Sequence, residues 1–174
     1  MTQAHGLYIE DLEIGQSASV LKTVSDQDIR QFAEITGATN PVHLDEDFAA
    51  QTTTKTRIAH GMFSAGLISA AIGMHLPGPG SVYLDQSLKF RLPIYLGDEV
   101  ETRVTVTDIN LRRGRVTLST DCFVAGKRVT QGEAVVMVDK KPVAGGRGHA
   151  DSARQIPAAG NRRAGQAAAG GDRA

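Results

Sequence analysis

The fold is decided by the segment from Gly61 to His75, which reads GMFSAGLISAAIGMH. This segment is apolar on nearly every face of a helix, and its many small residues allow other elements to approach closely. At about 1.5 Å per residue, a helix of this length measures roughly 22 Å, which is too short to span a membrane. The segment therefore predicts a buried helix at the centre of a small domain.

The chain downstream of this segment predicts strands and turns as far as Val138. Four runs alternate apolar and polar residues, at 82–90, 100–106, 116–124 and 135–137, and glycine-containing turns join them at Gly97, Gly114 and Gly126. Residues 7–24 predict an edge strand. One long helix followed by these strands predicts an α+β fold, with an antiparallel β-sheet wrapped around the long central helix. Because such a sheet has exposed edges, we expect a dimer that continues it.

Upstream of the central segment, a second helix is predicted to begin after Ser25 and to end at Gly37. Ser25 is suited to cap a helix with two aspartates in its first turn, and Gly37 can adopt the left-handed backbone that ends one. This helix leads into residues 38–42, which we expect to form a rigid loop with a turn at Asn40 and Pro41. His43 follows, and an imidazole held there can exchange a proton with water near neutral pH.

The composition favours one domain and a tail. A chain of 174 residues buries one sizeable core, which we place at residues 1–140. Residues 141–174 are rich in alanine, glycine and arginine and contain no aromatic residue, which predicts a disordered tail. The tail has a net charge of +4 and the whole chain a net charge of zero, so the domain has −4 and no basic surface for nucleic acid.

Several kinds of site and location are not favoured. Cys122 is the only cysteine, which excludes an intrachain disulfide and a thiolate zinc site. The five histidines lack the spacing of metal ligands, so we expect no metal. Because the chain has neither a long apolar run nor the layout of a secretory signal, we expect a cytoplasmic protein with no membrane partner.

The start of the central helix suggests a site for negative charge. Gly61 directly follows His60 and begins the helix, so its backbone amide is free to donate, and without a Cβ atom it admits a carbonyl oxygen closely. Ser69 lies further along, on the length of helix that we expect to be buried. Each residue also has a structural explanation: a loop histidine making a hydrogen bond, a glycine that eases packing, and a serine bonded to its own helix.

The order of the segments is more specific than any one of them. The chain contains TGATNPVHLDEDFA at 36–49, RIAHGM at 57–62 and GSVYLDQSLKFRLPIYLGDEV at 80–100. Together, over residues 10–138, they resemble the MaoC-like (R)-specific enoyl-CoA hydratases, which have a hot-dog fold. The resemblance implies reversible hydration of trans-2-enoyl-CoA to (R)-3-hydroxyacyl-CoA, a lyase reaction. It implies no cofactor, because coenzyme A is part of the substrate.

The resemblance also implies roles for individual residues. His43 matches the catalytic histidine, Asn40 the asparagine of its loop, Gly61 the amide that binds the oxyanion, and Ser69 a serine near the site. The catalytic aspartate of the family falls on Ala38. Alanine cannot transfer a proton, and general acid–base catalysis contributes about 10² to 10⁴-fold per group, so we expect this chain to hydrate enoyl thioesters poorly.

Three explanations of Ala38 are open: an introduced Asp-to-Ala substitution, a naturally inert subunit that pairs with a competent one, or a site that uses Glu34 or Asp47 instead. The second explanation gives an alternative function, a non-catalytic acyl-thioester-binding subunit of a heteromeric dehydratase. We accordingly expect a homodimer, with a heterodimer as the alternative. A hot-dog thioesterase is disfavoured, because such enzymes usually need a carboxylate on or facing the central helix and residues 61–74 contain none.

An acyl-CoA thioester substrate carries phosphates, which basic side chains would bind. The candidates are Lys55, Arg57, Lys89 and Arg91. Basic residues on exposed strands are most often solvated, so each of them also has a purely structural explanation.

Overall fold

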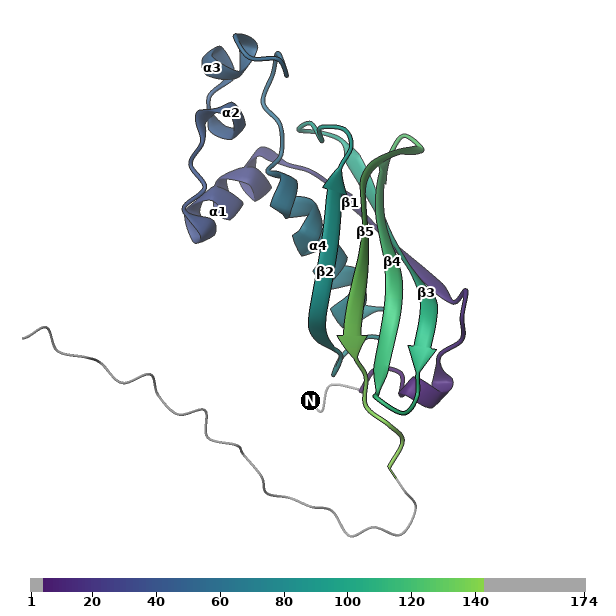
Figure 1. Cartoon of the computed structure of the whole chain (residues 1–174). Coiled ribbons are helices and arrows are strands. Elements are labelled where there is room, and N and C mark those ends of the chain that lie inside the picture. Colours follow the sequence, from purple (N-terminus) through teal and green to yellow (C-terminus); the bar gives the residue numbers. More distant parts are fainter. Residues whose placement is uncertain (1–4, 143–174) are drawn as a thin grey trace, which may run out of the picture. The chain divides into compact units, whose positions relative to one another are not determined.

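The computed structural model describes residues 5–142, whose ribbon is drawn in colour in Figure 1. The elements in chain order are the 3-10 helix η1 (Ile9–Asp11), β1 (Ser17–Thr23), α1 (Asp26–Thr36), α2 (Pro41–Leu44), α3 (Glu46–Ala50), α4 (Gly61–Met74), β2 (Val82–Phe90), β3 (Glu99–Asn110), β4 (Arg115–Val124) and β5 (Lys127–Met137). The predicted domain boundary falls at the end of the described range, and the predicted tail beyond Pro142 lies outside it.

The five strands form one antiparallel sheet in the order β1-β3-β4-β5-β2, which confirms the predicted sheet and the edge position of β1. Successive side chains of a strand point to opposite faces. On β3, Val100, Val104 and Val106 are at most 1% exposed, on the face that packs on α4. The last strand begins at Lys127, eight residues before the run that predicted it, because its polar first half pairs with β4 through the backbone.

Helix α1 begins and ends where the sequence predicts. The Ser25 hydroxyl accepts a hydrogen bond from the backbone N–H of Asp28, and the Asp28 carboxylate accepts one from the Ser25 N–H, which completes a capping box. At the other end, Gly37 has φ 72°, a left-handed conformation that costs glycine little. These two ends fix where the chain leaves α1 for residue 38.

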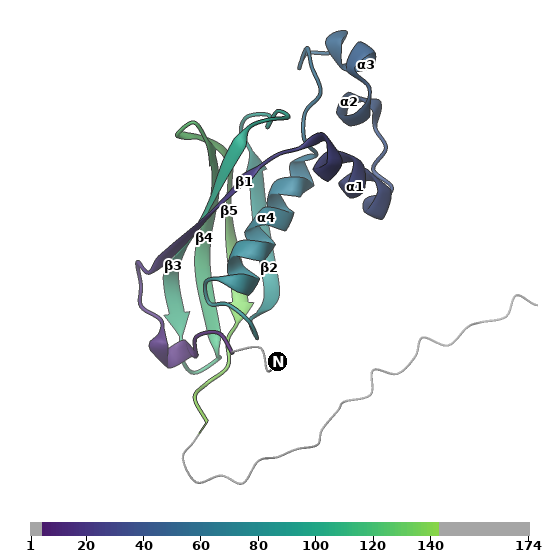
Figure 2. The same cartoon turned by 180° about the vertical axis from the view of Figure 1, so that it is seen from behind.

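Helix α4 packs on the inner face of the sheet through one side only. Ile68 and Ile72 are almost fully buried there, and each stabilises the fold by roughly 1.5–3 kcal/mol. The prediction of burial on every side is wrong for the single chain, since Met62 and Met74 are 57% exposed and Ser69 is also exposed. A five-stranded sheet covers one side of the helix, and Figure 2 shows α4 lying across that sheet with no other element of residues 5–142 over it. Within residues 5–142, no helix is both long and apolar enough to cross a membrane.

Helices α1, α2 and α3 form a group at the N-terminal end of α4 (Figure 1). Arg57, which lies between α3 and α4, connects them through two ion pairs. Its Nη1 lies 2.7 Å from Oδ1 of Asp26 on α1, and its Nε lies 3.4 Å from Oε2 of Glu46 on α3. The group is therefore held against the segment that leads into α4.

The side chain of Gln86 adds hydrogen bonds to the backbone pairing between the edge strand β2 and β5. The amide nitrogen of Gln86 donates to the hydroxyl of Thr120 at 3.1 Å and to the backbone carbonyls of Ser87 and Glu133. This side chain occupies the space beside Gly132, where a Cβ atom would overlap the carbonyl oxygen of Ser87 and lie 2.9 Å from the Gln86 nitrogen. Position 132 therefore requires glycine.

We expect Gly132→Ala to destabilise the protein by about 2–3 kcal/mol, because the new methyl group meets backbone that cannot move without breaking the β2–β5 pairing. Urea unfolding measures the change. The control is Ser87→Ala, an exposed side chain on the same strand, which should stay within about 0.5 kcal/mol of the unsubstituted protein. Equal stabilities for the two variants would contradict the packing described here.

Candidate active site

His43 lies on a single turn of helix, α2, and not on the rigid loop that the sequence predicts. Asn40 caps this turn, since its Oδ1 accepts a hydrogen bond from the N–H of Val42 at 3.3 Å, and Pro41 occupies the first helical position. Proline is well suited to that position because its fixed φ is helical and its missing N–H would have no partner there. Asn40 thus orients the turn that carries His43. Its neighbour Asp45 caps α3.

The ring of His43 is held in one tautomer. Its Nδ1 lies 2.9 Å from the backbone carbonyl oxygen of Ile58, which can only accept, so Nδ1 carries the proton. Nε2 is then unprotonated and has a lone pair that can accept a proton from water. The same bond joins α2 to the segment that precedes α4.

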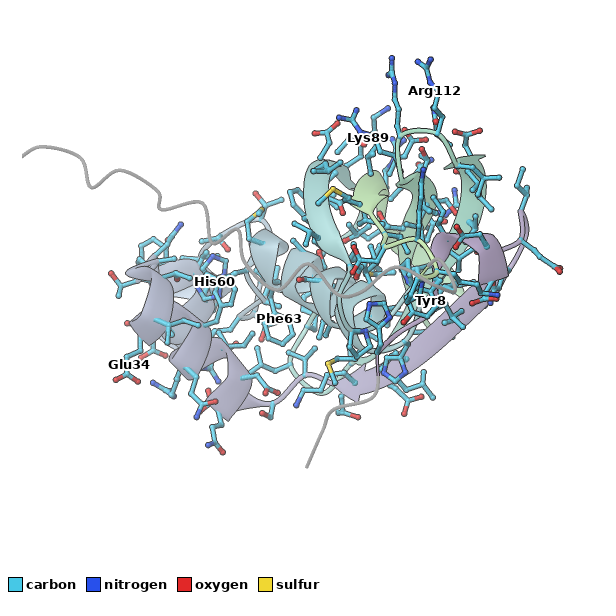
Figure 3. The ribbon with its side chains drawn as sticks, turned by 90° about the horizontal axis from the view of Figure 1, so that it is seen from below. Tyr8, Glu34, His60, Phe63, Lys89 and Arg112 are labelled. Atoms are coloured by element: carbon cyan, nitrogen blue, oxygen red, sulfur yellow. The ribbon has the colours of Figure 1, made fainter. Side chains whose placement is uncertain are left out.

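His60 lies against His43 immediately before α4. The two ring centroids are 3.8 Å apart with the planes tilted by 33°. Nε2 of His60 donates to the backbone carbonyl of Ala38 at 2.8 Å, which brings residue 38 to the same place. The segment after α1, the turn α2 and the start of α4 therefore converge, and Figure 3 shows His60 between the helical group and α4.

Gly61 is the first residue of α4, so its N–H has no carbonyl partner within the helix. A Cβ atom at this position would lie 3.3–3.4 Å from the ring of Phe90, so glycine keeps the Phe90 ring close to the helix N-terminus. Amides at a helix N-terminus carry partial positive charge. The free amide is therefore suited to bind an oxyanion.

Two cavities meet at His43, His60 and Gly61, which line both of them. One has a volume of about 320 Å³ and extends toward β2 and the residues that follow it. The other has a volume of about 670 Å³ and extends along α4. Both volumes are typical of small-molecule sites. The further lining residues used below are Ser64, Phe90, Arg91 and Thr130 for the first cavity, and Phe32, Ala38 and Ser69 for the second.

A pair of buried hydroxyls supports the start of α4. The Thr130 hydroxyl, on β5, donates to Oγ of Ser64 at 3.1 Å, and the Ser64 hydroxyl donates to the carbonyl of Gly61 at 2.7 Å. Both side chains are at most 1% exposed. The sequence analysis did not identify them as site residues. A serine three positions after Gly61 was the available signal, but its partner on β5 depends on the tertiary structure.

The remaining predicted site residues are placed differently from one another. Ala38 and Ser69 both line the larger cavity, although Ser69 is exposed and not buried as predicted. Glu34 and Asp47 are exposed, and neither lines either of the two cavities among the described residues. Figure 3 shows Glu34 on the outer side of α1, away from His60. A site that uses these carboxylates in place of residue 38 is therefore not formed in this structure.

Of the four basic residues predicted to bind phosphate, Arg91 lines one of the two cavities and the other three do not. Arg91 lines the smaller cavity, and its Nη2 donates to Oε1 of Gln131 at 3.2 Å. Lys89 lies on the face of the sheet opposite α4 (Figure 3), and Lys55 is exposed in the loop before α4. Arg57 is 16% exposed and is paired with two carboxylates, which makes it a poor phosphate ligand. Across residues 5–142, no group of three His, Cys, Asp or Glu side chains is placed to hold a metal ion.

Burial lowers the pKa of His43 below its usual value of 6.5, the hydrogen bond to Ile58 partly opposes this, and the neighbouring His60 lowers it further. His43 is therefore kept neutral and able to act as a base at neutral pH. The lowered pKa makes the stability of the fold depend on pH. Below pH 6.5, His43 of the unfolded chain binds a proton more strongly than His43 of the folded chain does.

We expect the free energy of unfolding to fall as the pH is lowered from about 7.5 to about 5.5, and to fall less in His43→Gln, which has no imidazole to protonate. Urea unfolding at both pH values measures the two differences. His75→Gln, which removes an exposed histidine at the end of α4, is the control and should behave like the unsubstituted protein. The same pH dependence with and without His43 would contradict the lowered pKa.

Comparison with known proteins agrees with this geometry. Residues 12–127 match the family model described as a MaoC like domain. The chain is 55% identical over 131 residues to an (R)-specific enoyl-CoA hydratase of Rhodospirillum rubrum, covering 75% of this chain and 91% of that protein. It is 51% identical to a 3-hydroxybutyryl-CoA dehydratase of Methylorubrum extorquens, covering 78% and 86% respectively.

Solved structures are similar throughout the described domain. The unliganded R-hydratase PhaJ1 of Pseudomonas aeruginosa is 44% identical with a TM-score of 0.75, covering 78% of this chain and 88% of that one. The (R)-hydratase of Aeromonas caviae is 42% identical with a TM-score of 0.72, covering 74% and 98%. These neighbours confirm the predicted hot-dog fold. The match over two thirds of its length, together with these relatives, shows that the chain belongs to the MaoC-like family.

Proposed function

We propose that this protein is an (R)-specific 2-enoyl-CoA hydratase, which adds water reversibly to trans-2-enoyl-CoA and gives (R)-3-hydroxyacyl-CoA. One observation carries the proposal: the imidazole of His43 and the free amide of Gly61 come from separate segments and line the same two cavities. The enzymes named above, which catalyse reactions of this class, support it.

The chemistry follows from the two groups. The thioester oxygen accepts a hydrogen bond from the Gly61 N–H, which stabilises the negative charge that develops on that oxygen; one such donor contributes about 2.7–4 kcal/mol. A water molecule gives a proton to Nε2 of His43 while its oxygen bonds to the β carbon, and the electron pair of the carbon–carbon double bond moves to form an enolate whose negative charge lies on the thioester oxygen. His43 then returns that proton from Nε2 to the α carbon as the enolate reverts to the thioester, so one water molecule is consumed and His43 is neutral again.

Ala38 limits this reaction. Its methyl group lines the larger cavity beside His43, at a position where the family has an aspartate. With one proton-transfer group in place of two, we expect slow hydration by this chain. The acyl chain would occupy the larger cavity along α4, and the coenzyme A end would leave past Arg91 in the smaller one.

The proposed assembly is a homodimer. The edge strand β2 exposes Val82 (51%) and Leu84 (45%), and the uncovered side of α4 exposes Met62 and Met74 (57% each). Exposed apolar side chains beside a free sheet edge are typical of a protein interface. A second copy that pairs along β2 would continue the sheet and cover α4.

Ala38 also favours a second candidate function, a non-catalytic acyl-thioester-binding subunit of a heteromeric dehydratase. In that assembly, a related chain that retains the aspartate would occupy the place of the second copy. Co-purification from cells with such a chain would support this candidate, whereas recovery of a purely homomeric protein would count against it.

We expect Ala38→Asp to increase kcat for hydration of crotonyl-CoA by about 10² to 10⁴-fold, because it supplies the second proton-transfer group. Loss of the enoyl absorbance measures the rate. Thr39→Asp is the control, since it adds the same charge at an exposed neighbouring position. If the two variants gave equal rates, the loop would not be catalytic.

For the assembly, we expect the protein to sediment as a dimer and Ala70→Glu to shift it to monomer, because residue 70 is exposed on the uncovered side of α4. Sedimentation velocity measures both. The control is Leu21→Glu on the opposite edge strand β1, which is 62% exposed and should leave the dimer intact. A dimer that is broken by Leu21→Glu and unaffected by Ala70→Glu would place the interface elsewhere.

A further inference from the structure

We propose that His60 is a positioning residue that holds the His43 ring and residue 38 in place beside the amide of Gly61, a role that rests on the proposed function. His60 is 5% exposed, and its side chain reaches the other parts of the site while its backbone directly precedes Gly61. His60 belongs to the segment RIAHGM, but the addition of water as described above gives it no proton to transfer.

The first contact of His60 fixes residue 38. Its Nε2–H donates to the Ala38 carbonyl at 2.8 Å, from a position 22 residues later in the chain. Thr36 contributes a weaker bond to the same segment, since its hydroxyl accepts from the Ala38 N–H at 3.3 Å. Residue 38 follows the glycine that ends α1, so the His60 bond determines how far its side chain enters the larger cavity.

The second contact of His60 fixes the plane of the catalytic ring. The His43 bond to Ile58 anchors Nδ1 but leaves the ring free to tilt about it, and the face of His60, 3.8 Å away, removes that freedom. Phe32 of α1 lies on His60 with a centroid distance of 4.9 Å, and Phe63 of α4 meets Phe32 edge-on at 6.0 Å. The stack therefore joins α1, α2 and α4.

A buried nitrogen of His60 without a hydrogen-bond partner indicates that ring packing alone does not explain a histidine at this position. With Nε2 donating to Ala38, Nδ1 of His60 is a buried acceptor, and it has no hydrogen-bond partner in the described structure. Buried polar atoms without partners destabilise a fold, and phenylalanine would fill this space without one. What phenylalanine would lose is the donor to residue 38.

The experiment compares His60→Phe, which keeps the stacked ring and loses the donor, with His60→Gln, which keeps an N–H donor and loses the ring. Both are made in the Ala38→Asp background, and His75→Phe, at the exposed C-cap of α4, is the matched control. We expect His60→Phe to lower kcat about 10- to 100-fold with KM changed less than about threefold, because small misplacements of catalytic groups have effects of this size.

We expect His60→Gln to recover part of that loss and His75→Phe to have no effect. The thermal midpoint of His60→Phe should be equal to or above that of its parent. A loss of kcat would then come from misplaced groups in the site and not from loss of folded protein. A kcat within about twofold of the parent for His60→Phe would overturn the proposal, because repositioning predicts a larger loss.

A readout without activity keeps this test independent of the proposed function. In the chain with Ala38, ¹⁵N NMR of the His43 ring should show a proton on Nδ1, and His60→Gln should increase the share of the Nε2–H tautomer. An unchanged His43 spectrum in His60→Gln would overturn the positioning role even if Ala38→Asp proved inactive. Conversely, a changed spectrum with no hydratase activity would overturn only the proposed function.

Discussion

The site depends on one hydrogen bond, from Nδ1–H of His43 to the backbone carbonyl of Ile58. It connects a single turn of helix to the segment that leads into α4, and it determines which ring nitrogen keeps a lone pair. A four-residue helix such as α2 has little stability of its own, so it needs such contacts and the Asn40 cap to be ordered. Arg57 strengthens the same junction through its pairs with α1 and α3.

The central helix contributes the second group of the site, a helix N-terminus that has no charged side chains and is held in place by packing. No carboxylate or basic side chain lies between Gly61 and Met74, so the partial charge of the helix end is not neutralised by its own residues. Thr130 and Ser64 connect this end to β5 by hydrogen bonds made inside the core. The amide of Gly61 is thus fixed by the sheet and the histidine by the helical group, and the two cavities lie where these supports meet.

Local patterns in the sequence predicted most of the fold. Ser25, Gly37 and Gly61 marked the ends of α1 and the start of α4, and period-two alternation located the strands, because these signals act over a few residues. Burial of Ser69 was predicted wrongly, since an apolar helix does not reveal that its sheet covers one side. The pairing of Arg57 with Asp26, the contact of His60 with Ala38 and the bond from Thr130 to Ser64 could not be predicted, because each joins residues more than 20 positions apart.

The central claim is that one thioester lies between the amide of Gly61 and Nε2 of His43. A crystal structure with a non-hydrolysable enoyl thioester analogue tests it most directly. The claim predicts the carbonyl oxygen about 3 Å from the Gly61 nitrogen and the β carbon on the side of Nε2, with room for one water molecule between them. A carbonyl oxygen bound elsewhere, or a β carbon turned away from His43, would contradict it.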